Sequence, residues 1–246
     1  MELRGKSISI PGIVIYVIGI LLGLGLCGWS TWGEIEATLL VFHTGEGLIQ
    51  LHCPLMLDSI ETGSVSASFD NPTGEVIHPT VSAVIGHAVV PRTESTVLTL
   101  APGEKKQLQW KVGPSDMVFG GLILVNIYET SQRNFSSQQG SCGILFSRFP
   151  LLPGKWIYIF LFIASLTCIG IGATLWVIGN SPLRRRMESA TNAGFVLAGF
   201  VFAGLLLTLP RLWVLSGFLF LAAIMLIVVV MTEFVLFPSG TYHRRI

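Results

Sequence analysis

The chain contains one literal match to a nucleotide-binding fingerprint. Residues 23–28 read Gly-Leu-Gly-Leu-Cys-Gly, which fits the pattern G-x-G-x-x-G. In a dinucleotide-binding turn, this pattern follows a strand and opens a helix whose N-terminus faces the pyrophosphate. Here the six residues lie inside an uninterrupted apolar run, and no βαβ unit surrounds them. The match therefore predicts no nucleotide site.

Histidines and aspartates in the polar middle of the chain could serve as metal ligands. The four histidines have no H-x-x-x-H spacing, and the chain has no C-x-x-C pattern, which are spacings typical of metal sites. The hydrolase pattern G-x-S-x-G and the zincin pattern H-E-x-x-H are also absent. We therefore expect surface histidines, no metal, no cofactor, no catalytic residues and no enzymatic activity. The histidines are His43, His52, His78 and His87.

Three aspartates stand at the ends of predicted strands: Asp58, Asp70 and Asp116. Aspartate side chains accept hydrogen bonds from backbone N–H groups in turns, which explains their positions without a catalytic role. A calcium site on these carboxylates is the alternative. We favour the structural interpretation.

Four cysteines divide between the polar middle and the apolar parts of the chain. Cys53 and Cys142 lie on the alternating faces that we assign to a core, and we predict a disulfide between them, with two buried free thiols as the alternative. A bridge that closes a loop of about 90 residues would stabilise the fold by roughly 4–5 kcal/mol in the chain-entropy model. Cys27 and Cys168 lie in apolar runs and are interpreted as small packing residues.

The composition indicates a membrane protein. Hydrophobic residues make up 51% of the chain and charged residues 12%, against roughly 25% charged in soluble domains. A helix needs about 20 apolar residues to cross the hydrocarbon, and four stretches meet or approach that length. They are Gly12–Trp32, Trp156–Ile178, Ala193–Leu209 and Leu212–Phe237.

The spans and the polar middle define the predicted domain organisation. Pro210 and Arg211 join the last two spans into a helical hairpin over 193–237, and a polar segment separates the first two. The fold class is therefore a membrane bundle of four transmembrane helices with an inserted all-β domain. Its parts are 1–32 (N-terminus and first helix), 33–155 (β-domain), 156–178 (second helix), 179–192 (basic loop), 193–237 (hairpin) and 238–246 (basic tail).

Basic residues predict the orientation in the plasma membrane. Short segments rich in Lys and Arg stay on the cytoplasmic side, and an even number of spans places all the basic segments on that side. Both termini are then cytoplasmic, and 33–155 is extracytoplasmic. Tryptophans at the outer ends of the spans agree, since indoles prefer the interface. The topology anchors are Arg184, Arg185, Arg186, Trp29, Trp32, Trp156 and Trp213, with Arg244 and Arg245 in the tail.

The first span also resembles a signal peptide, with Gly28 and Ser30 as a small-x-small cleavage pair. Its apolar run exceeds the usual 7–15 residues of such a segment, so an uncleaved helix is favoured. A lipoprotein site at Cys27 is disfavoured by the bulky Leu26 before it. Cleavage would leave the rest of the topology unchanged.

Alternating apolar and polar residues predict antiparallel strands in the polar middle. Ile49–Leu57, Val65–Phe69 and Leu108–Val112 have this period of two, which buries one face and leaves the other wet. Turn clusters rich in Gly, Pro, Asn and Asp separate them. This rhythm of short strands is typical of a β-sandwich. Further candidate strands are Ala37–Phe42, Thr80–Ile85, Thr96–Leu100, Leu122–Tyr128 and Gly143–Phe146.

Three segments carry a resemblance to a known group of domains: Phe69-Asp-Asn-Pro-Thr, Leu98-Thr-Leu-Ala-Pro-Gly-Glu and Leu108-Gln-Trp-Lys-Val. Over roughly 60–146 the chain resembles bacterial immunoglobulin-like and fibronectin-III-like adhesion modules. In these, a strand ends in an Asn-Pro turn, and a Leu-x-Pro-Gly-Glu turn leads into an alternating strand. The resemblance implies an immunoglobulin-like sandwich that contacts proteins or glycans. It carries over no catalytic residue.

Small residues at helical spacing recur in three spans. In lipid, close approach of helix backbones at such positions drives helix association. They could pack this chain's own helices together or dock a partner subunit. They are Gly19, Gly23, Ala164, Cys168, Gly172, Gly199 and Ala203.

Polar groups in and around the spans predict little chemistry. No ionisable residue lies at mid-depth, where ion or proton pathways ordinarily need one. Glu233 lies near the end of the last span, within reach of the basic tail. Asn134-Phe135-Ser136 matches the glycosylation pattern on the predicted outer side.

These observations favour a non-catalytic accessory or assembly subunit of a membrane complex, with membrane lipid and membrane proteins, or further copies of itself, as partners. The alternative is a small homo-oligomeric transporter or channel component, and a membrane enzyme comes third. The net charge of +1 argues against nucleic-acid binding. We expect Met117, Phe119 and Phe135 to contact the partner, unless they pack into the sandwich ends or touch lipid headgroups.

Overall fold

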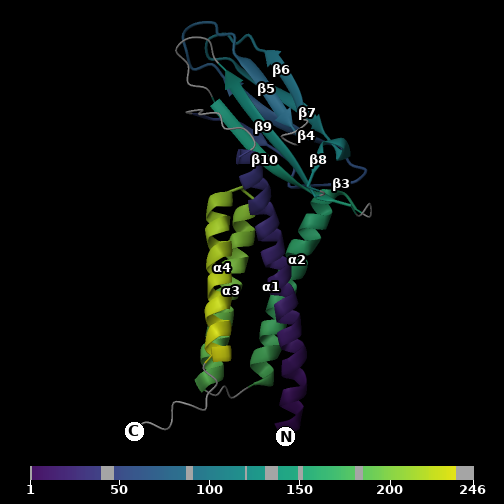
Figure 1. The fold of residues 1–246 in the computed structure, drawn as a ribbon, viewed down its shortest axis with the longest axis vertical. Helices are drawn as coiled ribbons and strands as arrows, with labels where there is room; N and C mark the ends of the chain where they lie inside the picture. Colours follow the sequence, from purple (N-terminus) through teal and green to yellow (C-terminus); the bar gives the residue numbers. More distant parts are fainter. Residues whose placement is uncertain are drawn as a thin grey trace. The chain divides into compact units, whose positions relative to one another are not determined.

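The computed structural model describes residues 2–39, 47–86, 91–119, 121–130, 138–148, 152–180 and 185–236 (Figure 1). The chain forms two compact units. The first consists of Met1–Thr31 and Phe160–Ile246 and is called the helical unit. The second, Trp32–Ile159, is called the β unit.

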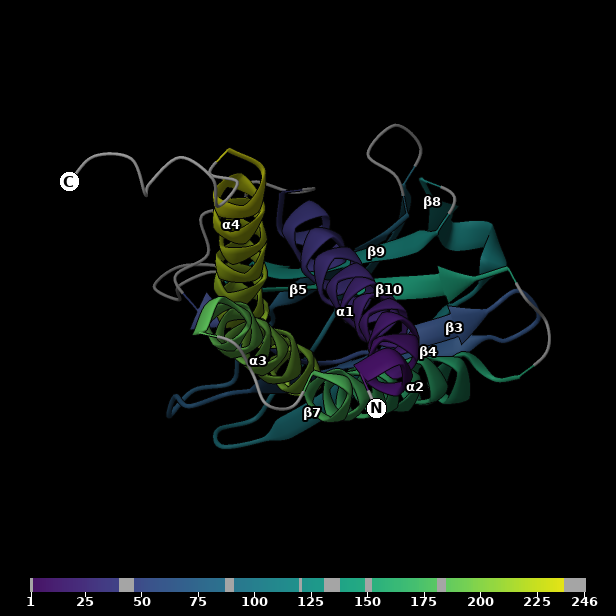
Figure 2. The ribbon, with the colours of Figure 1, turned by 90° about the horizontal axis from the view of Figure 1, so that it is seen from below.

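Four helices of the described chain are long and apolar enough to cross a membrane, judged by length and composition. The strands of the β unit come between the first two helices in the sequence, and α3 and α4 follow as an antiparallel hairpin (Figures 1 and 2). The helices are α1 (Glu2–Leu39), α2 (Gly154–Gly179), α3 (Arg185–Thr208) and α4 (Trp213–Leu236).

Two helices extend further than their apolar stretches predict. α3 begins at Arg185, because the helix continues through polar residues ahead of Ala193. α1 continues past Trp32 to Leu39. The predicted strand Ala37–Phe42 is therefore wrong over its described part, which is helical.

The β unit contains two sheets. One has the order β1-β10-β9-β5-β6, with β3 also paired to β10 and β8 to β9; the other has the order β2-β4-β7. The strands are β1 (Gly47–Leu48), β2 (Gln50–His52), β3 (Met56–Asp58), β4 (Gly63–Asp70), β5 (Thr80–Ile85), β6 (Arg92–Val97), β7 (Lys105–Val112), β8 (Met117–Val118), β9 (Leu122–Thr130) and β10 (Gln138–Ser147).

The two sheets enclose one hydrophobic core, so the β unit is a β-sandwich. Alternate residues of β4, β5, β7, β9 and β10 enter this core, among them the buried Phe69 and Trp110. Cys53 and Cys142 are joined by a disulfide, as the sequence predicted, and the bridge packs in the same core. Alternation of residue type had identified β4 and β7, because one face of each contacts the opposite sheet.

Two strand predictions differ from the structure. The stretch Ile49–Leu57 is divided, because β2 pairs with β4 in the small sheet whereas β3 pairs with β10 in the large one. The chain thus changes sheets near the disulfide. Thr96–Leu100 is displaced: β6 ends at Val97, and the buried Leu100 instead forms an isolated bridge with Ile77.

The α1 helix contacts the other helices of the helical unit through small residues. A Cβ added to Gly19 would lie 2.7 Å from Ile169 N, and one added to Gly172 would collide with the Tyr16 backbone. The Ser165 hydroxyl donates to Gly19 O at 2.8 Å. Backbones therefore approach closely where α1 meets α2.

Candidate interaction surfaces

The aspartates singled out in the sequence are held by turns. The Asp58 carboxylate accepts a hydrogen bond from Ile60 N at 2.5 Å, and the Asp116 carboxylate accepts one from Gly113 N at 3.0 Å. Asp70 is exposed and pairs with Lys105 at 3.9 Å. Within the described residues, no group of three or more His, Cys, Asp or Glu side chains could hold a metal ion.

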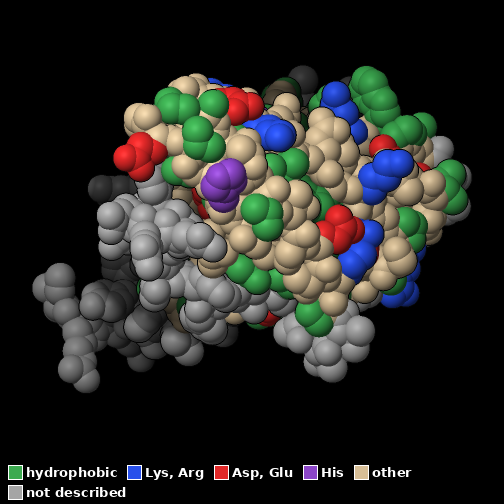
Figure 3. Space-filling view, turned by 90° about the horizontal axis from the view of Figure 1, so that it is seen from above, with side chains coloured by type: hydrophobic (Ala, Val, Ile, Leu, Met, Phe, Trp, Pro, Cys, Tyr) green, Lys and Arg blue, Asp and Glu red, His purple; other side chains and the backbone are tan. Residues whose placement is uncertain are grey.

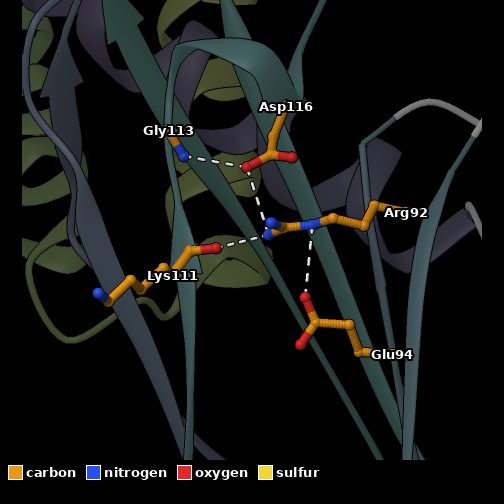
Figure 4. A network of polar contacts seen from close by, with 5 residues as sticks. All are labelled: Arg92, Glu94, Lys111, Gly113 and Asp116. Carbon is orange, nitrogen blue, oxygen red and sulfur yellow. Dashed lines mark hydrogen bonds and ion pairs between the residues drawn. The ribbon is translucent and has the colours of Figure 1, made fainter.

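Asp116 belongs to a network of polar contacts that joins β6, β7 and the turn after β7 (Figure 4). Arg92, at the start of β6, lies 3.4 Å from the Asp116 carboxylate and 3.7 Å from Glu94, and it also donates to Lys111 O. Asp116 is buried, whereas Arg92 is about half exposed. The network thus fixes the turn between β7 and β8 against the edge strand β6.

Asn71 clasps the two turns that carried the resemblance. Its side-chain amide donates to Glu75 O at 2.8 Å, Leu100 O at 3.0 Å and Ala101 O at 3.1 Å, while Thr73 N donates to its Oδ1 at 3.0 Å. Its backbone N–H donates to Glu104 O at 3.0 Å. Asn71 is 1% exposed, and its hydrogen bond to Leu100 O is buried as well. Sequence reasoning identified both turns but not their contact.

The last turns of α1 pack on the large sheet, on the face opposite the core. Thr38 Oγ1 lies 3.0 Å from Ser141 Oγ, and Asn126 Nδ2 donates to Ala37 O at 3.4 Å. Gly33 and Gly143 meet so closely that a Cβ at Gly143 would collide with the Gly33 backbone. This explains why β9 is buried on both faces. The continuous apolar run of β9 was the available signal, and the sequence reasoning missed it.

The side chains of Asn126 and Glu129 are polar groups buried in the β unit. Asn126 Oδ1 accepts no hydrogen bond from the described residues, although the amide nitrogen of the same side chain reaches α1. Glu129, near the end of β9, is 7% exposed. Burial, with a smaller contribution from the charge on Asp70, raises the pKa of the Glu129 carboxyl.

One end of the sandwich carries most of the large exposed apolar side chains of the β unit. We call this end the base; both helical connections leave the β unit there, at Trp32 and Ile159. The other end, where Thr80 pairs with both Thr130 and Val97, is called the distal end. The exposed apolar residues of the base are Trp32 (55%), Ile60 (77%), Phe119 (66%), Leu152 (52%) and Trp156 (57%).

The residues predicted to contact a partner differ in their exposure to solvent. Phe119 is exposed and has a φ of 49°, in the left-handed region that aromatic residues rarely adopt. Met117 is half-buried and packs against the core. Phe135 and the glycosylation pattern at Asn134 lie outside the described residues. Among the described candidates, the structure therefore presents Phe119 more openly than Met117.

Of the residues predicted to pack helices together, some lie against a neighbouring helix and others do not. Gly19, Gly23 and Gly172 face neighbouring helices at distances that leave no room for a side chain. Gly199 is exposed, and a Cβ there would meet nothing within 4 Å. Half-buried positions are found for Ala164, Cys168 and Ala203.

The α3 helix uses a neighbouring set of residues for its contacts. A Cβ at Gly204 would lie 3.2 Å from the sulfur of the buried Cys27, and Ser216 donates to Gly204 O at 3.2 Å. Spacing alone did not show which small residues of α3 face a neighbouring helix.

A cavity of about 270 Å³ lies in the helical unit between α1, α2 and α3. Its polar groups bond to one another: the Tyr16 hydroxyl donates to Gly194 O at 2.5 Å, and Trp176 Nε1 donates to Thr191 Oγ1 at 3.0 Å. Apolar side chains such as Ile13 and Phe195 complete the lining. The cavity thus offers apolar surface and little polar recognition.

The remaining predicted residues can be placed as follows. Trp29 is 54% exposed and Trp213 half-buried. Arg185 and Arg186 begin α3, and Glu233 lies near the end of α4. Of the histidines, His52 and His78 are both exposed, and His78 Nδ1 lies 3.1 Å from Thr99 Oγ1. Arg184, Arg244, Arg245, His43 and His87 lie outside the described residues.

The surface drawn in Figure 3 shows no gathering of one charge. Lys and Arg side chains alternate with Asp and Glu among uncharged polar groups, and hydrophobic side chains form small separate groups. This face therefore carries no extended basic or apolar patch.

Comparison with known proteins gives only distant likenesses. No family model and no curated protein matches the chain. Among solved structures, the CARDB domain of the PF1109 protein from Pyrococcus furiosus has 14% identity and a TM-score of 0.34, over 44% of this chain and 96% of that one.

Two enzymes show similar values. Red sea bream transglutaminase has 15% identity and a TM-score of 0.34, over 42% of this chain and 15% of that one. A β-glucosidase from Listeria innocua has 14% identity and a TM-score of 0.32, over 45% of this chain and 17% of that one. This level of similarity assigns neither a family nor an activity to the chain.

Proposed function

We propose that this chain is a non-catalytic integral membrane protein that presents an immunoglobulin-like sandwich outside the plasma membrane, as an accessory or assembly subunit of a membrane complex. The observation that carries the proposal is the use of buried polar side chains in the β unit. Asn71, Asp58 and Asp116 hold turns and join loops. The hydrogen bonds of these side chains stabilise turns of the β unit, which supports a structural role for them.

The surfaces of the helices support a membrane location. The outward face of α4 is apolar along its length, with Phe218 66%, Met225 70% and Val229 56% exposed. Apolar surface on this scale requires a cover of lipid or protein. The base adds two tryptophans where the candidate spans meet the β unit, and indoles favour the bilayer interface.

The immunoglobulin-like assignment is supported by the core. In that group, a buried Trp packs beside a disulfide between strands of a sandwich. Here Trp110 belongs to the same core cluster as Cys53 and Cys142. The clasp around Asn71 gives the two resemblance-bearing turns a common structural role.

Purification of the full chain from native membranes in mild detergent, after chemical crosslinking, tests the function. A stoichiometric foreign membrane protein supports the accessory role. A homo-oligomer without a foreign subunit contradicts it and favours the transporter or channel alternative.

Orientation is tested separately in intact cells. The assay uses the single introduced cysteines Val76→Cys and Ser189→Cys in a Cys27→Ala/Cys168→Ala background. The proposal expects a membrane-impermeant maleimide to label the first from outside and not the second. The reverse pattern would overturn the topology.

A further inference from the structure

We propose that the base of the sandwich is a membrane-contact surface that rests in the phosphate and headgroup layer of the bilayer; this inference rests on the proposed membrane function. It is argued from the unequal distribution of exposed apolar side chains over the two ends of the β unit. Phosphate-bearing lipid is the single occupant proposed.

Strand register and loop contacts place the apolar residues of the base at one end. β9 begins at Leu122, which pairs with Leu145 near the end of β10, so the Phe119 turn lies beside the segment leading to α2. Gly154, at the start of α2, donates to the Glu61 carboxylate at 3.0 Å. This contact brings the Ile60 loop to the same end.

The first helix reaches this end as well. A Cβ at Gly33 would lie 3.1 Å from the Leu122 side chain, so the residue after Trp32 is beside the start of β9. The five apolar residues of the base therefore come from four separate segments that the fold gathers together, because Leu152 and Trp156 both lie at the start of α2.

The chemistry of the base matches a headgroup layer. Trp32, Phe119 and Trp156 are aromatic, and aromatic rings concentrate at membrane interfaces. Two exposed cations, Arg148 and Lys155, flank the apolar residues in the same segment of chain. Lys and Arg attract anionic headgroups, and their long stems tolerate partial burial.

The distal end provides the contrast. Its large exposed apolar side chains are Val76 (55%) and Val97 (65%), and neither is aromatic. Its neighbours include the charged pair Asp70 and Lys105. These two valines are matched controls, because they are as exposed as the residues of the base but lie at the other end of the strands.

Site-directed fluorescence in liposomes tests the proposal. The full chain, in a Cys27→Ala/Cys168→Ala background, receives one cysteine at a time by Ile60→Cys, Phe119→Cys or Leu152→Cys and is labelled with the dye NBD. The liposomes contain phosphatidylcholine, phosphatidylglycerol and a lipid with a shallow nitroxide quencher. We expect severalfold stronger quenching at these sites than at Val76→Cys or Val97→Cys.

A label at Phe218→Cys in α4 distinguishes failure of the base contact from failure of the membrane location. If Phe218→Cys is quenched but the base is no more quenched than the distal end, the base inference fails and the membrane proposal stands. If Phe218→Cys is also unquenched, the membrane function itself fails. If labels at the base are shielded from both lipid quencher and aqueous iodide only with a co-purified protein, the base binds protein and the inference is overturned.

Charge reversal gives a second measurement that keeps the fold intact. Arg148→Glu with Lys155→Glu should reduce quenching at Ile60→Cys in liposomes containing phosphatidylglycerol and leave it unchanged in pure phosphatidylcholine. Lys106→Glu, an exposed lysine near the distal end, is the control and should have no effect. Equal effects of both changes would contradict a headgroup contact at the base.

Discussion

The helical unit and the β unit are held together by different kinds of contact. In the helical unit, glycines and hydroxyls bring backbones together, as where Ser165 donates to Gly19 O. In the β unit, large side chains such as Phe69 and Trp110 fill a core that a disulfide crosses. Burial of apolar area drives folding in water, whereas helices in lipid associate through close packing. With the helical unit in a bilayer, as proposed, each unit would be held together by the kind of contact suited to its solvent.

Removal of the disulfide should have the largest effect and should be confined to the β unit. We expect Cys53→Ala with Cys142→Ala to lower the free energy of unfolding by about 2–5 kcal/mol, as for native bridges in exported domains. Hydrogen exchange read by mass spectrometry should show faster exchange in β4, β9 and β10. Cys27→Ala with Cys168→Ala is the control. Equal acceleration in α2 and α3 would contradict the separation of the two units.

Overpacking of the α1–α2 contact should have the next largest effect, in the helical unit. In Gly172→Leu the new side chain would collide with the Tyr16 backbone, and overpacking typically costs about 1–3 kcal/mol. Thermal unfolding in detergent should occur at lower temperature. Gly199→Leu, where a Cβ meets open space, should be nearly neutral. Similar losses in both variants would remove Gly172 from a special packing role.

The Asn71 clasp should be the most costly single polar contact in the β unit. Asn71→Ala removes the amide that donates to Leu100 O and Ala101 O. Each carbonyl keeps a backbone donor, Ile77 N or Glu104 N, so we expect a loss of about 1 kcal/mol for each hydrogen bond removed. Hydrogen exchange at residues 71–75 and 100–104 should accelerate first. Thr99→Ala, in the adjoining exposed position, is the control. An unchanged melting temperature for Asn71→Ala would show that the turns fold independently.

Glu129 should make the stability of the β unit depend on pH. Burial raises the pKa of this carboxyl in the folded state, so the folded state binds the proton more tightly than the unfolded chain. Its contribution is full below the unfolded pKa of about 4.3 and is lost as the pH rises through the higher folded pKa. Glu129→Gln should therefore raise the melting temperature near neutral pH and change it little at about pH 4. Equal shifts at both pH values would contradict this assignment.

The smallest effect on stability is expected for Phe119→Gly. This change should keep or slightly raise the melting temperature while it weakens the contact of the base with lipid. Its φ of 49° suits glycine, so Phe119→Gly relieves backbone strain of about 1 kcal/mol or more, largely offset by the entropy of the freer unfolded chain. The melting temperature should remain equal or rise slightly. Quenching of a label at Ile60→Cys by shallow lipid quenchers should fall, and a clear loss of stability would show that the Phe119 ring supports the fold.

Several features were predictable because they depend on short stretches of sequence. The apolar runs in α2 and α4 exceed the thickness of a bilayer, and their length alone predicted long helices. The period of two in β4 and β7 identified strands with one buried face. The bridge between Cys53 and Cys142 followed because both cysteines occupy alternating core positions in the polar part of the chain.

The tertiary structure alone decided which of these elements meet. Ala37–Leu39 resembles the start of a strand, yet it is helical because Gly143 and Asn126, about a hundred residues later, accept a helix against β9 and β10. The base is likewise absent from any window of sequence, since Ile60, Phe119 and Leu152 come together only through strand register. Periodicity reports the face that a segment buries, whereas the partner on that face is set by long-range pairing.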